Sequence, residues 1–453
     1  MVSGSMLLVI LVVSIVIMVF MISKFRIHPF VSLFTVALLM GLASGMPLLE
    51  VTNTISTGFG NTCRSIGIVI LFGTIIGAML EGSGAAITMA DTVLKRVGEK
   101  RPALAMSIIG WIVSIPVFCD SGFVILSSLN RSLAKRSGTR MATMAIALST
   151  GLYATHTLVP PTPGPIAAAG NLGADLGLVI LWGVAVSIPA MLAGYLYAVT
   201  VGSRIEVRTS DDDDWEALLH RHLKLPSPTQ AFAPIVVPLL LIALSSAVNY
   251  PTILALVGKG SALHSAASFI GSPMIALFVG LLLCIPLVPS HRDRGDEDWS
   301  NWLTKGVKDG ASIIMITAAG GSLGAIIAAT KVGAYIGEQL AQFRLGVFLP
   351  FVISAALKTA QGSSTVALIT TSGIVAPLLS SLGLGAPMGA VLATLSIGCG
   401  AMVVSHANDS YFWVVTQFSD MEVGDAYKAQ TVATFIEGVV GVIGVWIVSL
   451  FLL

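Results

Sequence analysis

The sequence predicts an all-α polytopic membrane protein, with about ten membrane crossings, two re-entrant hairpins and two interrupted helices arranged as two inverted repeats. Three observations predict it. Of the 453 residues, 55% are hydrophobic and only 10% are charged, whereas an ordinary soluble domain carries about 25% charged residues. Mean hydropathy is +0.91. Apolar runs of about 17–25 residues, the length that crosses a bilayer, recur along the chain.

The predicted crossings are apolar runs bounded by polar or basic residues. The first run, Met6 to Ile22, lacks the basic start of a signal peptide and is longer than a typical signal core, so we expect a retained helix. The full set lies at 6–23, 29–46, 64–81, 141–172, 177–200, 231–250, 272–289, 311–329, 387–418 and 431–453.

Two further apolar stretches, 103–137 and 346–380, are each about twice as long as one crossing. Polar or small residues interrupt them, from Cys119 to Gly122 in the first and from Thr359 to Ser364 in the second. Polar backbone at membrane depth must be buried in protein or line a wet cavity. We therefore predict two re-entrant hairpins whose tips meet near the midplane.

Basic residues set the expected orientation, because loops rich in Lys and Arg stay in the cytoplasm. The connections 47–62, 173–176 and 251–270 are nearly free of Lys and Arg and are expected outside. Both termini are then periplasmic, and the two hairpins enter from opposite sides. Lys331 and Arg344 are the two basic residues that this assignment places outside. The residues expected inside are Lys24, Arg26, Lys95, Arg96, Lys100, Arg101, Arg131, Lys135, Arg136, Arg140, Arg204, Arg208, Arg221, Lys224, Arg292, Arg294, Lys305 and Lys308.

The chain divides into two similar halves. Residues 1–200 form the first predicted repeat, 201–230 a cytoplasmic linker and 231–453 the second repeat. Each half contains a hairpin followed by an interrupted helix, at 141–172 in the first half and 387–418 in the second. Because each half has an odd number of crossings, the halves are expected to be inverted. Inverted repeats with matching discontinuous helices indicate a transport site where the repeats meet.

The two hairpin tips and the two helix breaks carry the candidate substrate site. Half-helix N-termini present free N–H groups that suit a carboxylate, and the hydroxyls at these breaks can bind substrate hydroxyls. Lys358 is the one basic residue inside these motifs. The candidate substrate-binding residues are Asp120, Ser121, Gly122, His156, Thr157, Thr162, Gly164, Gly362, Ser363, Ser364, Thr365, Ser405, His406, Asn408 and Asp409.

Four titratable residues at the breaks are candidates for proton coupling: Asp120, His156, His406 and Asp409. Ionisable groups inside a membrane are costly and usually functional, and His titrates near physiological pH. Each also has a structural interpretation. Asp120 can cap the second hairpin arm, each His can bond a backbone carbonyl freed by its break, and Asn408 with Asp409 can cap a half-helix. Asp120 is the first choice for the proton carrier.

Other functional classes find little support. A net charge of +1 gives no indication of nucleic-acid binding, which usually requires a basic surface. Phosphate-binding and dinucleotide motifs are absent, the four cysteines have no metal-type spacing, and we predict no cofactor or metal. A channel needs a continuous polar path, whereas these polar residues concentrate at one level. A membrane enzyme would rest on Asp120 and His156 alone, since no His-Glu-x-x-His motif occurs.

At its breaks the sequence resembles the gluconate permease (gluconate:proton symporter) family, within the ion transporter superfamily, over essentially the whole chain. The most specific pieces are Thr155-His156 with Pro160-Pro161-Thr162-Pro163-Gly164-Pro165, Gly362-Ser363-Ser364-Thr365-Val366-Ala367, and Ser405-His406-Ala407-Asn408-Asp409. The family implies proton-coupled uptake of gluconate and related hydroxy acids across the bacterial inner membrane. The superfamily implies a homodimer with a scaffold and a moving transport domain that carries both hairpins.

Three departures from the family pattern fall in the expected pocket. Gluconate carriers have Glu where this chain has Asp120, His where it has Thr162, and Pro-Gly where it has Ser410-Tyr411. The resemblance therefore leaves the substrate open among gluconate, a four-carbon aldonate, a uronate, glycerate and D-serine. Sodium coupling is the nearest alternative mechanism, because superfamily relatives use it through Ser, Asn and Thr at hairpin tips. Acidic and His residues at the breaks favour protons.

Overall fold

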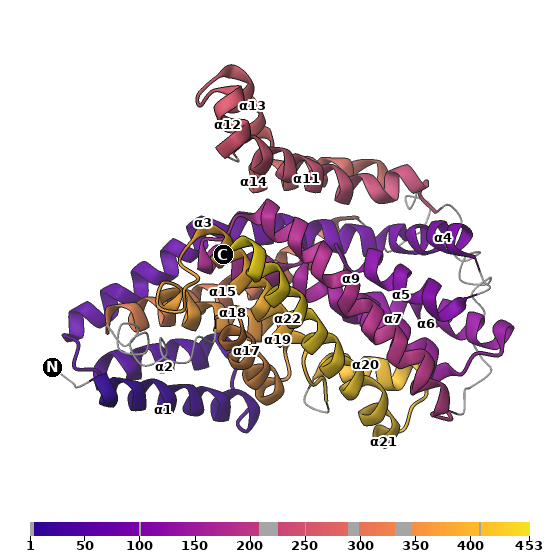
Figure 1. The fold of residues 1–453 in the computed structure, drawn as a ribbon, viewed down its shortest axis with the longest axis horizontal. Helices are drawn as coiled ribbons and strands as arrows, with labels where there is room; N and C mark the ends of the chain where they lie inside the picture. Colours follow the sequence, from indigo (N-terminus) through magenta and orange to yellow (C-terminus); the bar gives the residue numbers. More distant parts are fainter. Residues whose placement is uncertain are drawn as a thin grey trace.

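A computed structural model describes residues 4–98, 101–207, 225–249, 251–288, 299–330, 346–406 and 409–453, and these ranges contain helices and no strands (Figure 1). The first half forms α1 (Gly4–Ser23), α2 (Pro29–Ala43), α3 (Leu48–Gly82), α4 (Ala85–Val97), α5 (Pro102–Val113), α6 (Cys119–Ser137), α7 (Met141–Leu158), α8 (Pro163–Leu172) and α9 (Leu176–Thr200). The second half forms α11 (Pro228–Asn249), α12 (Pro251–Val257), α13 (Ala262–Ile270), α14 (Pro273–Leu283), α15 (Trp299–Ala329), α17 (Phe348–Gln361), α18 (Ser364–Val375), α19 (Pro387–Met402), α20 (Ser410–Phe418), α21 (Val423–Ala426) and α22 (Val432–Leu452).

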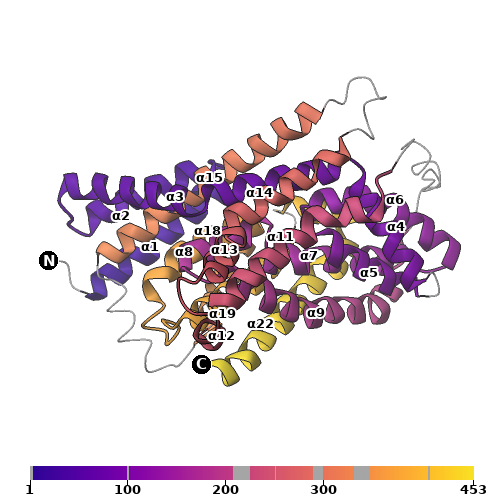
Figure 2. The same cartoon turned by 90° about the horizontal axis from the view of Figure 1, so that it is seen from above.

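The two longest helices, α3 and α15, pack along each other at one side of the molecule (Figure 2). Small residues permit the close approach: a Cβ on Gly58 would lie 2.7 Å from the carbonyl oxygen of Gly321. The Ser322 hydroxyl donates to the carbonyl of Ile55 at 2.9 Å. Close packing of small residues with interhelical hydrogen bonds is the usual way that membrane helices associate. Helices α3 and α15 therefore pack closely against each other.

Both predicted hairpins are present. The first consists of α5 and α6, and the second of α17 and α18, with its tip at Gly362 and Ser363. Each first arm packs against the interrupted helix of its own half through a glycine that faces a carbonyl. A Cβ on Gly151 of α7 would lie 2.2 Å from the Ser107 oxygen of α5, and a Cβ on Gly400 of α19 would lie 2.4 Å from the Phe351 oxygen of α17.

Both interrupted helices are also present, as α7 followed by α8 and as α19 followed by α20. The short helix of each half packs against the hairpin of the other half, α8 against α18 and α20 against α6. The side chain of Leu368 on α18 fills the space beside Gly164 of α8. This reciprocal packing of each short helix on the other half's hairpin places the two hairpins and the two interrupted helices in one common core.

The remaining helices surround this core. In Figure 1, α11 and α14 form a layer across the top, and α12 and α13 project beyond it. Helix α4 lies next to α5 and α11, and α3 ends at its predicted place, where Glu81 forms a 2.7 Å ion pair with Lys305 of α15. Large apolar side chains such as Leu256 and Leu263 are exposed, as expected for a protein that faces lipid.

Several sequence-based boundaries are wrong. The third helix begins at Leu48 and not near residue 64, so the expected connection 47–62 is helical. Val51, Ile55 and Gly58 are buried in this segment, with Gly58 against Gly321 of α15, whereas most of its Thr, Asn and Ser residues are exposed. The connection 251–270 contains α12 and α13, and Lys305 and Lys308 lie in α15 and not in a loop. In the first hairpin the break is at 114–118, and Cys119 opens α6.

Five helices of the described ranges are long and apolar enough to cross a membrane, or up to seven if each bent pair counts as one span. Several shorter apolar helices belong to the hairpins and interrupted helices. The protein is therefore a multi-pass membrane protein, while the count of ten crossings and the inverted relation of the halves stay predictions. Most of the predicted linker, at 208–224, and both Lys331 and Arg344 lie outside the described residues.

Candidate transport site

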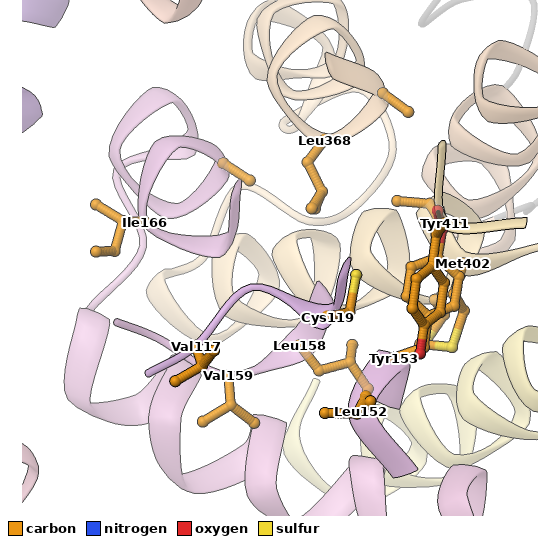
Figure 3. Close-up of a cluster of buried hydrophobic side chains, with 14 of the residues drawn as sticks. Val117, Cys119, Leu152, Tyr153, Leu158, Val159, Ile166, Leu368, Met402 and Tyr411 are labelled. Carbon is orange, nitrogen blue, oxygen red and sulfur yellow. Dashed lines mark hydrogen bonds between the residues drawn. The ribbon is translucent and has the colours of Figure 1, made fainter. Parts of the chain in front are cut away.

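The two hairpin tips and the two helix breaks come together at the centre of the core. Figure 3 shows a cluster of buried hydrophobic side chains beside these breaks, with Tyr153 and Tyr411 side by side and Cys119 between them and the first tip. The labelled residues come from the first hairpin (Val117, Cys119), the first interrupted helix (Leu152, Tyr153, Leu158, Val159, Ile166), the second hairpin (Leu368) and the second interrupted helix (Met402, Tyr411). The fold thus brings together the four breaks that the sequence singled out.

A buried ion pair joins the second hairpin to the second interrupted helix. The Lys358 ammonium, on the last turn of α17, lies 2.5 Å from Oδ2 of Asp409. Lys358 also donates to the carbonyl of Gly362 at the hairpin tip, at 2.7 Å, and its Nζ lies 6.0 Å from the centre of the Tyr153 ring. The Lys358 side chain is 0% exposed and that of Asp409 is 5% exposed, so solvent screens this pair very little.

Asp409 is held by three further contacts. The Ser405 hydroxyl donates to Oδ2 at 2.5 Å, and the backbone N–H of Tyr411 donates to Oδ1 at 3.1 Å. Asp409 is thus the N-cap of α20, as the structural interpretation of the sequence expected. Its own N–H donates to the carbonyl of His406 at 2.8 Å. The capping role and the ion pair coexist in one carboxylate.

The backbone of Ser405 is fixed from the side by the start of α22. Its N–H donates to Thr434 Oγ1 at 3.1 Å, and the Thr431 hydroxyl donates to its carbonyl at 2.5 Å. A π-helical turn, Tyr427–Thr431, precedes α22, and such turns are frequent at functional sites. The preceding residue, Val404, has φ +56°, which is rare for a β-branched residue. Together these features aim the Ser405 hydroxyl at the Asp409 carboxylate.

The second hairpin tip presents hydroxyls beside the ion pair. Gly362 ends α17 with φ +86°, a left-handed conformation that favours glycine. Ser363 caps α18 by accepting from the N–H of Val366 at 3.3 Å. Ser364 is buried in the first turn, where its side chain interacts with Tyr153, and Thr365 is half-buried beside Gly164. Ser364 therefore carries the hydroxyl of this tip that contacts Tyr153.

Tyr153, Tyr411 and His156 form an aromatic wall. The ring centres of Tyr153 and Tyr411 are 5.0 Å apart, and the rings of Tyr153 and His156 stack at 6.4 Å. The Tyr411 hydroxyl donates to the carbonyl of Ser149 at 2.9 Å. His156 is buried against Phe118 of the first tip, and its Nδ1 has no hydrogen-bond partner within the described part of the chain. His156 thus keeps one ring nitrogen available inside the core.

Asp120 lies in the first turn of α6 and not within the hairpin break. Its Oδ2 accepts a weak hydrogen bond from Cys119 at 3.6 Å and its carboxyl interacts with Ser410, whereas its Oδ1 lacks a hydrogen-bond partner among the described residues. The Asp120 and Asp409 carboxyls are close enough to repel each other. Ser121 is half-buried next to Asp120, and Gly122 packs against the Leu152 side chain of α7.

Two predicted hydroxyls mainly satisfy the backbone of the first interrupted helix. Thr162 donates to the carbonyls of His156 and Val159, at 3.0 and 2.8 Å, which the end of α7 leaves without helical partners. Thr157 donates to the carbonyl of Tyr153 one turn earlier, at 3.2 Å. In both residues the hydroxyl hydrogen is already used, so either could only accept a hydrogen bond from a substrate.

His406 is half-buried, and its Nε2 donates to the carbonyl of Thr359 at 2.7 Å. This bond ties the second break to the last turn of α17, as the structural interpretation of this His expected. Asn408 lies outside the described residues, so its predicted contact with substrate stays a prediction.

Two features of the site were not predicted from the sequence. The first is the ion pair of Lys358 with Asp409, which joins residues 51 positions apart and corresponds to no local sequence motif. Glu437 on α22 is fully buried, and neither of its carboxyl oxygens has a hydrogen-bond partner in the described ranges. A single Glu inside the otherwise apolar run 431–453 was the available signal. The described residues contain no group of three or more His, Cys, Asp or Glu side chains that could hold a metal ion.

A core of two hairpins and two interrupted helices, with a buried charged pair where they meet, defines the protein as a membrane permease. Residues 6–451 match the family model described as GntP family permease, and the chain belongs to this family. It is a transporter and not an enzyme.

Individual relatives agree with this assignment. The chain is 32% identical over 446 residues to a gluconate permease of Pseudomonas aeruginosa, covering 97% of each chain. It is 31% identical over 441 residues to the D-serine transporter DsdX of Escherichia coli, again covering 97% of each. Among solved structures, the YdaH transporter of Alcanivorax borkumensis is similar with a TM-score of 0.65 at 14% identity, over 93% of this chain and 98% of that one. The last similarity concerns the fold alone.

Proposed function

We propose that this protein is a proton-coupled secondary transporter that imports gluconate or a related hydroxy or sugar acid by alternating access. The buried Lys358–Asp409 pair carries the proposal, because it places a cation and a titratable anion where both hairpins and both interrupted helices meet. Asp120, His156 and His406 are the other titratable groups at this point. Family membership and the gluconate permease of Pseudomonas aeruginosa support an acid as the substrate.

The exact acid within this class is the second part of the proposal. A D-serine transporter is as similar to this chain as several gluconate carriers are. Thr162, one of the three positions that depart from the gluconate pattern, bonds its own backbone. The other departures, Asp120 and Ser410, interact with each other at the site. We therefore expect selectivity among small hydroxy acids to depend on this contact between α6 and α20.

Uptake by purified protein in proteoliposomes tests the function. The panel is gluconate, a four-carbon aldonate, a uronate, glycerate and D-serine, each with an inward proton gradient, with an inward sodium gradient and with neither. Saturable accumulation of at least one acid, driven by the proton gradient alone, is the expected result. Accumulation that requires sodium would contradict proton coupling, and uptake that does not saturate would favour a channel.

The Ser364→Ala variant tests the pocket. It is expected to raise the KM for the transported acid about 3- to 10-fold, because one hydrogen bond in a partly dry site contributes about 0.5–1.5 kcal/mol. Ser372→Ala on the same helix, which removes a hydroxyl away from the tip, is the matched control for folding and insertion. An unchanged KM for Ser364→Ala would remove the second hairpin tip from the pocket.

The proposed location is the bacterial inner membrane, with both termini in the periplasm and the protein as a homodimer. Single cysteines at 211–214 are expected to react with an impermeant maleimide from the cytoplasm, and those at 260–265 from outside, because Lys and Arg concentrate on the cytoplasmic side. Cys63, the one half-exposed cysteine of the four, is first replaced by Ser. The reverse labelling pattern would overturn the inverted-repeat assignment, and cross-linking in membranes tests the dimer.

A further inference from the structure

We propose that Lys358 is the receptor for the substrate carboxylate and that Asp409 occupies this position only while the site is empty. A proton taken up by Asp409 releases Lys358, the substrate carboxylate replaces the Asp409 carboxylate, and the site is neutral both empty and loaded. This inference rests on the proposed function and extends it to a stoichiometry of one proton per monocarboxylate. It also makes transport electroneutral.

The first argument is that Lys358 is the only Lys or Arg side chain that is buried among the described residues. An anion that enters a site of low dielectric constant needs a compensating charge, because the loss of hydration is otherwise too costly. Helix N-termini at the breaks contribute only partial charge. Lys358 is therefore the group in the described core that can balance a substrate carboxylate fully.

The second argument is that the Asp409 carboxylate is bound as a free carboxylate would be. Its Oδ2 accepts from the Lys358 ammonium and from the Ser405 hydroxyl, both at 2.5 Å. The Ser364 side chain, which contacts Tyr153 of the aromatic wall, offers a further hydroxyl that can bind a polyhydroxy acid. A substrate carboxylate in this place would meet the same two donors, so Asp409 acts as an internal substitute for it.

The exchange balances in atoms and charge. On the side of higher proton concentration an O–H bond forms on Asp409, and its ionic bond to Lys358 breaks. The ammonium keeps its proton and binds the substrate carboxylate. On the other side the substrate leaves, Asp409 gives its proton to water, and the original pair forms again. The position shared by Lys358 and Asp409 contains one positive and one negative charge when it is empty, and it contains the same charges when it is loaded.

This charge balance explains why the two ions must move together. A proton without substrate would leave Lys358 as an unpaired buried cation, and a substrate without a proton would add a second anion beside Asp409. Either state carries a net charge into the low-dielectric core, which is costly. Only the empty and the fully loaded site can therefore change their exposure from one side of the membrane to the other.

Several other titratable groups face Asp409, and the scheme requires that they keep their protonation states through the cycle. They come from every neighbouring element of the core: Lys358 on α17, Cys119 and Asp120 on α6, Tyr153 and His156 on α7, His406 in the same break and Tyr411 on α20. Asp120 is the principal rival, because its carboxyl is within electrostatic range of Asp409 and has one oxygen without a partner in the described ranges.

The wild-type protein gives the first test. Initial rates of radiolabelled D-gluconate uptake are measured in proteoliposomes at one fixed proton gradient, with the membrane potential clamped by potassium and valinomycin at zero or inside-negative. Equal rates are expected, with one proton entering per gluconate. A rate that rises several-fold at inside-negative potential would overturn this inference and leave the proposed function intact. Absence of uptake driven by a proton gradient for every acid of the panel above would refute the proposed function itself.

Variants give the second test, with protein purified in the presence of gluconate. Asp409→Asn keeps the cap of α20 but cannot cycle a proton, so it should exchange gluconate across the membrane and lose gradient-driven accumulation. Asp120→Asn should still accumulate gluconate, with an altered KM. Lys95→Gln, at an exposed pair with Asp91 on α4, is the unaltered reference. Accumulation by Asp409→Asn, or its loss in Asp120→Asn alone, would overturn the assignment. If Asp409→Asn does not fold, the potential dependence of the wild type decides.

Discussion

Lys358→Met is expected to destabilise the detergent-solubilised protein more than other single substitutions at the site. It leaves the Asp409 carboxylate buried without its cation, and breaking a buried pair from one side costs about 3–5 kcal/mol. Transport should also be lost. The measurement is the apparent melting temperature, which is obtained from the fraction of protein that stays monodisperse after heating.

The matched control for Lys358→Met is the double variant Lys358→Met/Asp409→Asn, in which no charge is left unpaired. Its melting temperature should recover most of the loss, while gluconate uptake stays absent because the receptor cation is gone. Asp409→Asn alone should be stabilised by gluconate more than the wild type is, since the substrate carboxylate then supplies the missing partner of Lys358. A double variant no more stable than Lys358→Met would mean that the two charges do not depend on each other.

Gly151→Ala is expected to have the second largest effect. A Cβ at this position would lie 2.2 Å from the carbonyl oxygen of Ser107 on α5, and backbone cannot move aside as a flexible side chain can. Overpacking of this kind costs about 1–3 kcal/mol, and occasionally more. Because α5 carries the first hairpin tip, separating it from α7 should lower both the melting temperature and the rate of uptake.

Gly60→Ala is the control for Gly151→Ala. Gly60 is exposed in α3 with no atom within 4 Å of the Cβ that Ala would add. Replacing an interior helical Gly by Ala usually stabilises by about 0.5–1 kcal/mol, so this variant should equal or exceed the wild type in melting temperature. Similar losses in both variants would mean that the α5–α7 contact is not as tight as the geometry indicates.

Much of the fold could be predicted because its main signals are local. A run of apolar residues indicates a membrane helix, and a polar or proline-rich interruption such as Pro160 to Pro165 indicates a break in that helix. Boundaries were less reliable where a residue type has two meanings. Asp120 marks the first turn of α6 because acidic residues favour helix N-termini, yet it was interpreted as part of the hairpin tip, which lies at 114–118.

The start of α3 shows a second limit. The connection 47–62 was predicted outside the membrane because it is nearly free of Lys and Arg, but residues 48–63 form the first half of a 35-residue helix. The buried face of this segment contains Val51 and Ile55 and packs against α15 through contacts such as Gly58 against Gly321. These contacts join positions more than 250 residues apart, so composition in a local window cannot reveal them.

The candidate site shows the same contrast. Asp409, Ser405 and Ser364 were predicted as site residues because they lie in conspicuous breaks. The ion pair of Lys358 was not predicted, because it depends on how α17 approaches the second break, where the Lys358 ammonium contacts Asp409. The hydroxyls of Thr157 and Thr162, also predicted to bind substrate, donate to backbone carbonyls of α7. Backbone groups at a break compete with a ligand for the same side chains.

The buried pair of Lys358 and Asp409 also limits how far the cell can concentrate substrate with this carrier. If each monocarboxylate enters with one proton and no net charge, the ratio of internal to external substrate at equilibrium equals the ratio of external to internal proton concentration. Each unit of pH difference then permits about a tenfold concentration of substrate, or about 1.4 kcal/mol. In an alkaline medium the driving force would disappear while the membrane potential persists. This carrier should then only equalise the internal and external concentrations of the acid, because an electroneutral step cannot use the membrane potential.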